Sequence, residues 1–361
     1  MLFHFFTSLI EQYSFLNVFK YLTFRTGLSV MTSLIVVFII GAPLIKFFSE
    51  KMITGPIRQD GPIDHIIKKS GTPTMGGLII IIGIIFSTLL WADLTNIYVW
   101  TLIFVSLSLG GLGLIDDILK IKFKNSSGLK SKYKFSGQLL IGAIALFVLI
   151  NYSNHEFLYN LYFPFFKNLI WNMGLFFIPF GLFVIIGASN AVNLTDGLDG
   201  LATVPVMLVA LSFTLISYVV GNTIFSEYLK IQYIPDVGEL SIFCGSVVGA
   251  CLGFLWYNAP PAKIFMGDTG SLSLGGSLAA IAIIVKHEIV LAIIGGLFVL
   301  ETVSVIIQVI SFKLTGKRIF KMAPIHHHFE QKGWAESTIV IRFWIIAIIL
   351  ALVGLATLKL R

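Results

Sequence analysis

Charged residues are scarce in this 361-residue sequence: only 12% are Asp, Glu, Lys or Arg, against about 25% in a typical soluble domain. Hydrophobic residues make up 57% of the chain, and the mean hydropathy is +0.92. Apolar runs of about 18 or more residues recur, and each suits a helix that spans a bilayer. The composition therefore excludes a soluble globular domain and predicts an all-α integral membrane protein.

Cysteine is equally rare, with only Cys244 and Cys251. They lie seven positions apart in one apolar run, which separates them by roughly 10 Å on a helix. That distance is too large for a disulfide between them, so both are expected to act as buried, small hydrophobic residues. The N-terminus lacks a basic segment before an apolar run, so no cleavable signal peptide is expected.

Ten apolar segments are predicted to span the membrane. They cover residues 25–48, 75–92, 97–115, 135–151, 174–190, 201–220, 240–257, 270–285, 288–312 and 338–358. Residues 1–24 are aromatic but also contain Glu11 and Lys20, so we expect them to form an interfacial helix that does not cross the bilayer. No internal repeat is visible, and residues 1–361 are expected to form a single membrane domain.

Basic residues gather in alternate loops. The segments 49–74, 116–134 and 313–337 are rich in Lys and Arg, whereas the intervening loops and both ends of the chain carry few. Positive charge is retained on the cytoplasmic side of a membrane. The basic loops are therefore predicted to face the cytoplasm and both termini the extracytoplasmic side. The net charge of +7 is then explained by the orientation of the chain in the membrane, and nucleic-acid binding is not expected.

Acidic residues gather at span ends on the predicted cytoplasmic side. The third span ends with two of them, the fifth is followed by two, and the eighth begins with one. These residues are Asp116, Asp117, Asp196, Asp199 and Asp268. Because ionisable groups near hydrocarbon are costly, those that persist there usually have a function. The five carboxyl groups are therefore predicted to share one active site in the cytoplasmic loops.

Each acid also has a purely structural interpretation. Adjacent Asp116 and Asp117 point about 100° apart on a helix, and a nearby lysine could form a weak ion pair with either. Asp196 and Asp199 stand beside glycines, in a turn where they could cap backbone amides. Asp268 could cap the N-terminus of its span. It could also hold a hard cation, since carboxylates and phosphate oxygens are the usual ligands of Mg²⁺.

Three consecutive histidines, His326, His327 and His328, lie in a basic segment. They cannot converge on one metal from one helix, and no HExxH zinc motif is present. Hydrogen bonding to a phosphate or a sugar fits them better, with a solvated basic loop as the alternative. In the ninth span, Glu301 and Gln308 share a helix face, where Glu301 is expected to form interhelical hydrogen bonds and Gln308 could contact a ligand.

Together, these features indicate phosphoryl transfer between a soluble diphosphate and a lipid. The acids could hold Mg²⁺, the lysines and histidines could bind phosphates, and the bilayer adjoins them. A secondary transporter is the alternative from another class. Transporters, however, place ionisable residues near the midplane, within broken helices and repeated halves. A membrane metalloprotease is disfavoured because its metal-binding motif is missing.

Five motifs resemble, in the expected order, the phospho-N-acetylmuramoyl-pentapeptide transferase family, within the polyprenyl-phosphate N-acetylhexosamine-1-phosphate transferase superfamily. They are GTPTMGG (71–77), DDILK (116–120), NLTDGLDGL (193–201), NAPPAKIFMGDTGSL (258–272) and MAPIHHHFE (322–330). The acid motifs are shared across the superfamily, whereas GTPTMGG and MAPIHHHFE favour the muramoyl-pentapeptide branch. The nearest alternative is a sibling enzyme that uses UDP-GlcNAc with the same lipid.

The resemblance implies an Mg²⁺-dependent homodimeric enzyme of the bacterial cytoplasmic (inner) membrane. Its reaction moves phospho-MurNAc-pentapeptide from UDP-MurNAc-pentapeptide to undecaprenyl phosphate, which gives lipid I and UMP in the first membrane step of peptidoglycan synthesis. A direct attack by the lipid phosphate is favoured over a covalent aspartyl-phosphate. The reason is that a phosphate monoester, with a second pKa of about 6, needs little deprotonation near neutral pH.

The resemblance also implies residue roles. The expected catalytic residues are Asp116, Asp117, Lys120, Asp268, His326 and His327. Asp268 would hold Mg²⁺ against the diphosphate, with Asp116 and Asp117 as further candidate ligands near the lipid phosphate. The expected substrate-binding residues are Lys69, Thr74, Lys134, Asn190, Asp196, Asp199, Asn258, Gln308 and His328. Whether Lys68 or Lys69 matches the family lysine is left open.

Overall fold

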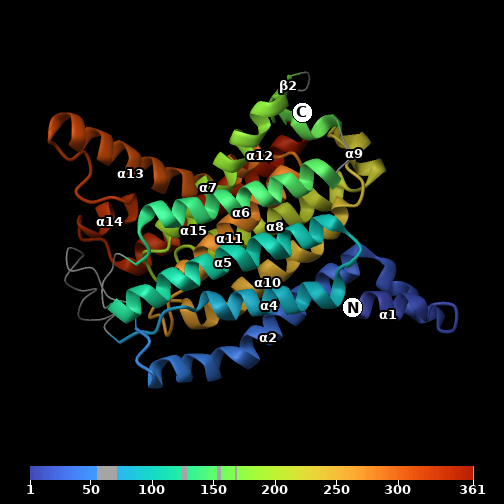
Figure 1. The fold of residues 1–361 in the computed structure, drawn as a ribbon, viewed down its shortest axis with the longest axis horizontal. Coiled ribbons are helices and arrows are strands. Elements are labelled where there is room, and N and C mark those ends of the chain that lie inside the picture. Colours follow the sequence, from blue (N-terminus) through green and yellow to red (C-terminus); the bar gives the residue numbers. More distant parts are fainter. Residues whose placement is uncertain (55–70, 124–127, 153–155, 167–168, 361) are drawn as a thin grey trace.

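The computed structural model describes residues 1–54, 71–123, 128–152, 156–166 and 169–360, and these are almost entirely helical (Figure 1). The predicted Lys69, with its neighbour Lys68, lies outside the described residues. The long helices are α2 (Leu22–Glu50), α4 (Gly77–Trp91), α5 (Ile97–Phe123), α6 (Ser131–Tyr152), α7 (Phe177–Thr195), α8 (Thr203–Val220), α10 (Leu240–Asn258), α11 (Gly267–Ile284), α13 (Gly296–Thr315) and α15 (Glu336–Leu360).

Shorter elements occupy the ends of the bundle. The α-helices are α1 (Leu2–Ser8), α9 (Thr223–Leu229), α12 (Glu288–Ile294) and α14 (Ile325–Glu330). The 3-10 helices are η1 (Ser14–Lys20), η2 (Glu156–Tyr159), η3 (Gly174–Phe176) and η4 (Val237–Glu239). One antiparallel hairpin joins β1 (Asn160–Tyr162) to β2 (Ile170–Asn172), with Leu161 opposite Trp171.

Among the described residues, nine helices are long and apolar enough to cross a membrane, and α4 is a shorter apolar helix. Each of these ten segments overlaps one of the ten predicted spans, and the all-α multi-pass fold is confirmed. The prediction for residues 288–312 as one continuous span is wrong, because the helix breaks at Gly295 into α12 and α13. The adjacent glycines Gly295 and Gly296 explain the break, since glycine is a poor helix former.

The N-terminal segment also differs from the single interfacial helix that was predicted. Residues 1–24 form α1 and η1, and α2 already begins at Leu22. Arg25 of α2 is buried, with its guanidinium 2.6 and 2.8 Å from the two carboxylate oxygens of Glu239. This ion pair ties the first long helix to the start of α10.

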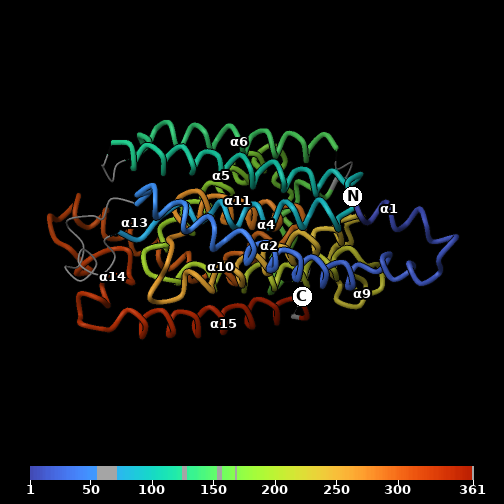
Figure 2. The backbone as a smooth tube through the Cα atoms, turned by 90° about the horizontal axis from the view of Figure 1, so that it is seen from below, coloured from blue at the N-terminus to red at the C-terminus, as the bar shows by residue number. Residues whose placement is uncertain are grey.

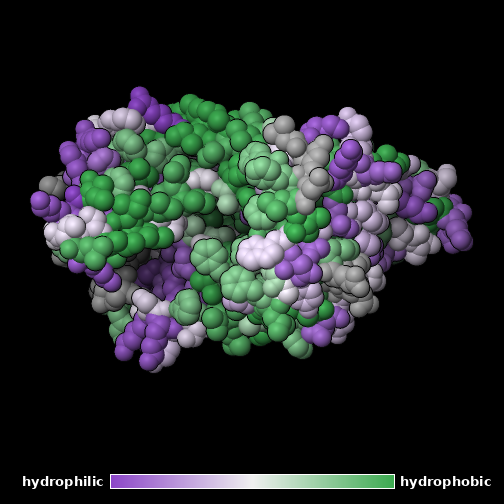
Figure 3. All heavy atoms as spheres, turned by 90° about the horizontal axis from the view of Figure 1, so that it is seen from above, coloured by the Kyte–Doolittle hydropathy of each residue, from purple (hydrophilic) through white to green (hydrophobic). Residues whose placement is uncertain are grey.

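The long helices lie side by side, and both termini are at the end of the bundle opposite α14 (Figure 2). Helices α5 and α6 lie on one side of α11, and α15 lies on the other (Figure 2). On the face seen in Figure 3, hydrophobic residues cover much of the middle, and hydrophilic residues gather toward the two ends. This distribution is the one that a bilayer-spanning bundle requires. Helix α13 slants away from the other helices, toward α14 (Figure 1).

Helix α11 is the centre of the bundle. Every residue from Asp268 to Ile284 is buried, and α4, α5 and α7 pack against it. Its first half is rich in Gly and Ser, as in GDTGSLSLGGS, and such small residues let membrane helices approach closely. The helix starts at the α14 end of the bundle, so its first turn is held by all the helices around it.

Two glycines make this close packing possible at the start of α11. A Cβ on Gly77 of α4 would collide with the backbone of Gly270, and a Cβ on Gly113 of α5 would collide with the carbonyl oxygen of Asp268. Gly113 therefore brings the last turns of α5 directly against the first turn of α11. The acids at 116 and 117 follow on the same helix.

This packing gives a matched pair of variants. Gly113→Ala should lower the free energy of unfolding by about 2 kcal/mol, because a backbone atom blocks the new methyl group. Gly111→Ala on the same helix should be neutral or slightly stabilising, because nothing lies within 4 Å of its Cβ position. Thermal unfolding in detergent would compare the two, and equal effects would contradict the close approach of α5 and α11.

Candidate active site

Asp117 holds the N-terminus of α11. Its carboxylate accepts the backbone N–H of Asp268 at 3.2 Å, the N–H of Thr269 at 3.0 Å and the Thr269 hydroxyl at 2.7 Å. These first amides of a helix have no partner within the helix, and a negative charge there is also favoured by the helix dipole. Asp117 therefore fixes the first turn of α11, and with it the position of Asp268.

Asp268 lies within that first turn and does not cap the helix, so the N-cap interpretation of this residue is wrong. Its Oδ2 is 2.5 Å from Lys134 Nζ of α6 and 3.0 Å from Lys120 Nζ of α5. Its Oδ1 accepts a hydrogen bond of 2.8 Å from the side-chain amide of Asn193 on α7. Side chains from three helices thus converge on one buried carboxylate.

Asp116 and Asp117 are adjacent but have different partners, as their angular separation on a helix predicts. Asp116 accepts the backbone N–H of Leu129 at 2.7 Å, and its second oxygen is 2.5 Å from Lys120 Nζ. Lys120 therefore bridges Asp116 and Asp268. Asp116 holds the segment that leads into α6, whereas Asp117 holds α11.

The three carboxyl groups could hold a metal ion. One oxygen each from Asp116, Asp117 and Asp268 lies within 4.8 Å of the others. In an octahedral Mg²⁺ site with bonds of about 2.1 Å, opposite ligands are about 4 Å apart. Three carboxylates against the two ammonium groups of Lys120 and Lys134 also leave an excess of negative charge. Donor type, spacing and charge therefore all fit a hard divalent cation.

The segment GTPTMGG pairs with the chain that leads into α11. Phe265 donates its N–H to the carbonyl of Pro73 at 2.9 Å, and Gly76 donates in return to the carbonyl of Phe265 at 2.9 Å. Gly77 donates to the carbonyl of Met266 at 2.8 Å. Thr74, a predicted substrate-binding residue, is buried with its hydroxyl beside Gly267. This motif therefore lines the approach to Asp268 from the side of α4.

Asp196 faces the acid cluster from the turn that follows α7. It accepts the backbone N–H of Gly267, one residue before Asp268. Loss of hydration, together with the negative charges of Asp268 and Asp117, raises the pKa of Asp196 to about 7. A carboxyl group with such a pKa needs a neighbouring positive charge to be fully ionised at neutral pH.

Asp199, three residues later, has a different task. It is buried, and its Oδ2 accepts the backbone N–H of Ala262 at 2.9 Å. Its own N–H donates to Glu336 of α15 at 3.0 Å. Asp199 therefore connects the turn after α7 to two other segments. Through these contacts it supports the backbone around the site.

Three predicted substrate-binding residues form hydrogen bonds within the protein. Asn258 is 2% exposed and accepts from the Gly200 N–H and the Thr203 hydroxyl. Asn190 donates to Gln138 at 3.0 Å. Gln308 accepts the N–H groups of residues 319 and 320 and donates to the carbonyl of residue 320. These contacts position the turn after α7, the packing of α6 on α7, and the chain after α13.

The three histidines diverge, as expected for consecutive residues. His326 is fully buried and lies against Gly197. His327 is partly exposed, with its Nδ1 2.6 Å from a carboxylate oxygen of Glu330. His328 accepts the N–H of Lys321 at 3.1 Å. Only His327 and His328 present ring atoms to solvent, so of the two predicted catalytic histidines His327 is the accessible one.

Sequence reasoning left Asn193 out of the site. It was visible only as one member of a polar stripe, Asn190, Asn193 and Asp196, at three-residue spacing. The structure places its amide between Asp268 and the Ser271 hydroxyl, at 2.8 Å from each. The spacing alone could not have identified it, because Asn190 of the same stripe contacts Gln138 of α6 instead of α11.

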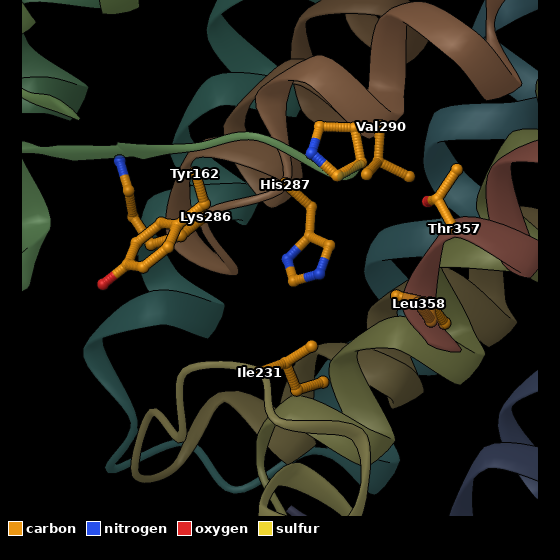
Figure 4. A pocket seen from close by; sticks show the side chains of 8 residues that line it. Tyr162, Ile231, Lys286, His287, Val290, Thr357 and Leu358 are labelled. Carbon is orange, nitrogen blue, oxygen red and sulfur yellow. The ribbon is translucent and has the colours of Figure 1, made fainter. Parts of the chain in front are cut away.

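A separate small cavity lies at the opposite end of the bundle, near the C-terminus (Figure 4). Its lining includes Tyr162, His287, Thr357 and Lys286, and the Lys286 ammonium group is 2.6 Å from Glu288. The lining contains none of the predicted site residues that the structure describes. The acid cluster and this cavity are therefore independent features.

Asp196 gives a testable pH dependence. Because its pKa is raised above the value of about 3.9 in an unfolded chain, its contribution to stability is greatest at acid pH and is lost as the pH rises through about 7. Relative to the wild type, Asp196→Asn should gain on the order of 1 kcal/mol of stability as the pH rises from 5 to 8. Thermal unfolding without Mg²⁺ would measure this. A difference that does not change with pH would contradict the raised pKa.

Comparison with known proteins agrees with this site. Residues 99–286 match the family model described as Glycosyl transferase family 4, and residues 69–81 match Phospho-N-acetylmuramoyl-pentapeptide-transferase signature 1. The chain is 69% identical over 361 residues to the phospho-N-acetylmuramoyl-pentapeptide-transferase of Pelagibacter ubique (strain HTCC1062). It is 54% identical over 371 residues to that of Maricaulis maris (strain MCS10). Both matches cover 100% of each chain, and the protein therefore belongs to the phospho-N-acetylmuramoyl-pentapeptide-transferase family.

Proposed function

We propose that this protein transfers phospho-MurNAc-pentapeptide from UDP-MurNAc-pentapeptide to undecaprenyl phosphate in the bacterial cytoplasmic membrane, which yields lipid I and UMP. The names of its full-length relatives support this activity. One structural observation supports it most directly: three carboxylates within 4.8 Å of one another, with Lys120 and Lys134 on the same cluster. The cluster lies at one end of a bundle of apolar helices, where a soluble diphosphate and a membrane lipid can meet.

Asp268, with Asp116 and Asp117 beside it, would hold Mg²⁺, which would supply positive charge to the diphosphate of the donor. Lys120 and Lys134 would neutralise the phosphate oxygens. Asp117 already accepts three hydrogen bonds from the first turn of α11, so orienting that turn is its main task. This structural engagement of its carboxylate favours a mechanism in which Asp117 does not act as a general base.

The favoured reaction is a direct displacement. An oxygen of the lipid phosphate forms a bond to the β-phosphorus of the donor, and the bond from that phosphorus to the UMP oxygen breaks. The acceptor phosphate is already mostly ionised near neutral pH, because its second pKa is about 6. Positioning and charge neutralisation then account for catalysis.

The remaining predicted residues complete the proposal. Asp196 and Thr74 would line the donor side of the acid cluster, with His327 and His328 at its rim. Asp199, Asn190, Asn258 and Gln308 would support the backbone that surrounds the donor. Lys69 stays a predicted phosphate-binding residue from the sequence resemblance, as does the homodimer, which the mass of the purified protein in detergent would test.

The sibling reaction with UDP-GlcNAc is the second candidate, because the acid cluster alone would serve both donors. The match of residues 69–81 to the signature of the muramoyl-pentapeptide branch favours the first. The transporter alternative is disfavoured by the position of the acids, which gather at one end of the bundle and not at its midplane.

A transfer assay on purified protein would separate these candidates. It would contain undecaprenyl phosphate and either UDP-MurNAc-pentapeptide or UDP-GlcNAc, with and without Mg²⁺, and would follow UMP and the lipid-linked product. We expect Mg²⁺-dependent turnover of the muramoyl donor alone. Turnover of UDP-GlcNAc alone would assign the sibling reaction, and no UMP from either donor in folded protein would reject the transferase.

Substitutions in the cluster should act on turnover. Asp268→Asn should lower kcat by about 10³-fold or more, because the carboxylate that would hold Mg²⁺ against the diphosphate is lost. Asn193→Ala should lower it by about 10-fold, because Asp268 keeps its charge but loses an orienting hydrogen bond. Asp93→Asn, in the loop after α4 at the opposite end, is the control and should leave kcat unchanged. A fully active Asp268→Asn would overturn the assignment.

A further inference from the structure

Glu301 is a fully buried carboxylate in a helix that is otherwise mostly exposed. It lies in α13 with 0% exposure, and neither carboxylate oxygen has a hydrogen bond to any described residue. Its neighbour is His326 of α14, whose Nδ1 is 3.1 Å from Glu301 Oε2 and whose exposure is also 0%. An isolated buried charge costs several kcal/mol, so each of these groups depends on the other.

The other ring nitrogen of His326, Nε2, lies against the turn after α7. A Cβ on Gly197 would collide with His326 Nε2, so the ring lies directly on the backbone at this residue. Gly197 immediately follows Asp196, whose carboxyl accepts the N–H of Gly267 beside the acid cluster. A continuous series of contacts thus runs from Glu301 through His326 and Gly197 to Asp196.

Helix α13 packs against α7 and α15, but it has few polar ties to its surroundings. It is separated from α12 by the break at Gly295 and slants away from the other helices (Figure 1). Gln308 connects it to residues 319 and 320, and Glu301 connects it to α14. The pair of Glu301 and His326 therefore joins a peripheral helix to the turn that carries Asp196.

We propose that Glu301 is a positioning residue for the transfer reaction: through its contact with His326 Nδ1 it holds this imidazole against Gly197 and thereby fixes Asp196 beside the first turn of α11. His326 acts in the same way and does not contact substrate. This inference rests on the proposed function for its kinetic effect. Its structural effect, on the turn at residues 196–201, can be measured without any substrate.

The kinetic test compares binding with turnover. Glu301→Gln should raise KM for the UDP-linked donor about 10-fold, because the turn that carries Asp196 loses its support, while kcat changes by less than about 3-fold because the acid cluster is intact. Glu301→Asp, which keeps the charge, should restore part of the loss. If the two residues act through each other, Glu301→Gln combined with His326→Gln should be no worse than the more impaired single variant.

The structural test is hydrogen–deuterium exchange of the full-length protein in detergent. Glu301→Gln and Glu301→Ala should both accelerate exchange at residues 196–201 and 325–330, with exchange in α2 unchanged. Glu288→Gln is the matched control, because it removes a buried carboxylate that lies 2.6 Å from Lys286 at the opposite end of the bundle. That control should leave both KM and exchange at residues 196–201 as in the wild type.

The outcomes separate this inference from the proposed function. Faster exchange at residues 196–201 in protein that transfers neither donor would support the positioning role while rejecting the transferase. Normal transfer by the wild type, with Glu301→Gln unchanged in both KM and exchange, would overturn the positioning role. An equal acceleration in Glu288→Gln would also overturn it, because the effect would then be general destabilisation. If Glu301→Ala does not fold, the Glu301→Gln result decides.

Discussion

The end of the bundle that carries the acid cluster depends on one interaction, the capping of α11 by Asp117. The side chain of one membrane helix satisfies the first amides of another, in an environment where unpaired backbone groups are costly. Because α11 is buried along its whole length, its first turn has no freedom to move independently of the bundle. Asp268 lies in that turn, so its place among the lysines and acids follows from the cap.

Close helix packing is the second constraint, and small residues provide it. Gly113 and Gly77 let α5 and α4 approach the backbone of α11. In a bilayer, helices gain little from hiding apolar surface, so such tight contacts and interhelical hydrogen bonds hold them together. The bundle thus brings α5, α6, α7 and α11 to one point, and each contributes a polar side chain there.

Hydropathy and charge patterns predicted the membrane fold and the convergence of acids at one end, because both follow from the cost of placing charge in hydrocarbon. They could not predict the break at Gly295, since apolar residues continue on both sides of it. Neither could they show which of two adjacent acids caps α11, or that Asn193 contacts Asp268 while His326 is buried. Those outcomes depend on the rotation of each helix about its axis, which neighbouring helices set through packing.

The predicted site residues therefore divide into an acid cluster and a shell that holds it. Asp116, Asp117, Asp268 and the two lysines form the cluster, whereas Asn258 and Asp199 hold the surrounding backbone. The sequence motifs contain residues of both groups, and only the hydrogen bonds in the structure show which residue belongs to the cluster and which to the shell. Function at this site thus requires buried polar contacts well away from the reacting atoms.

The central claim is that the carboxylate cluster around Asp268 binds the divalent cation of the reaction. Electron paramagnetic resonance of Mn²⁺, titrated in place of Mg²⁺ into purified protein with UMP present, tests it most directly. The account predicts one bound ion per chain in the wild type, with affinity at least about 10-fold weaker in Asp268→Asn. Equal Mn²⁺ affinity in the two proteins would contradict it.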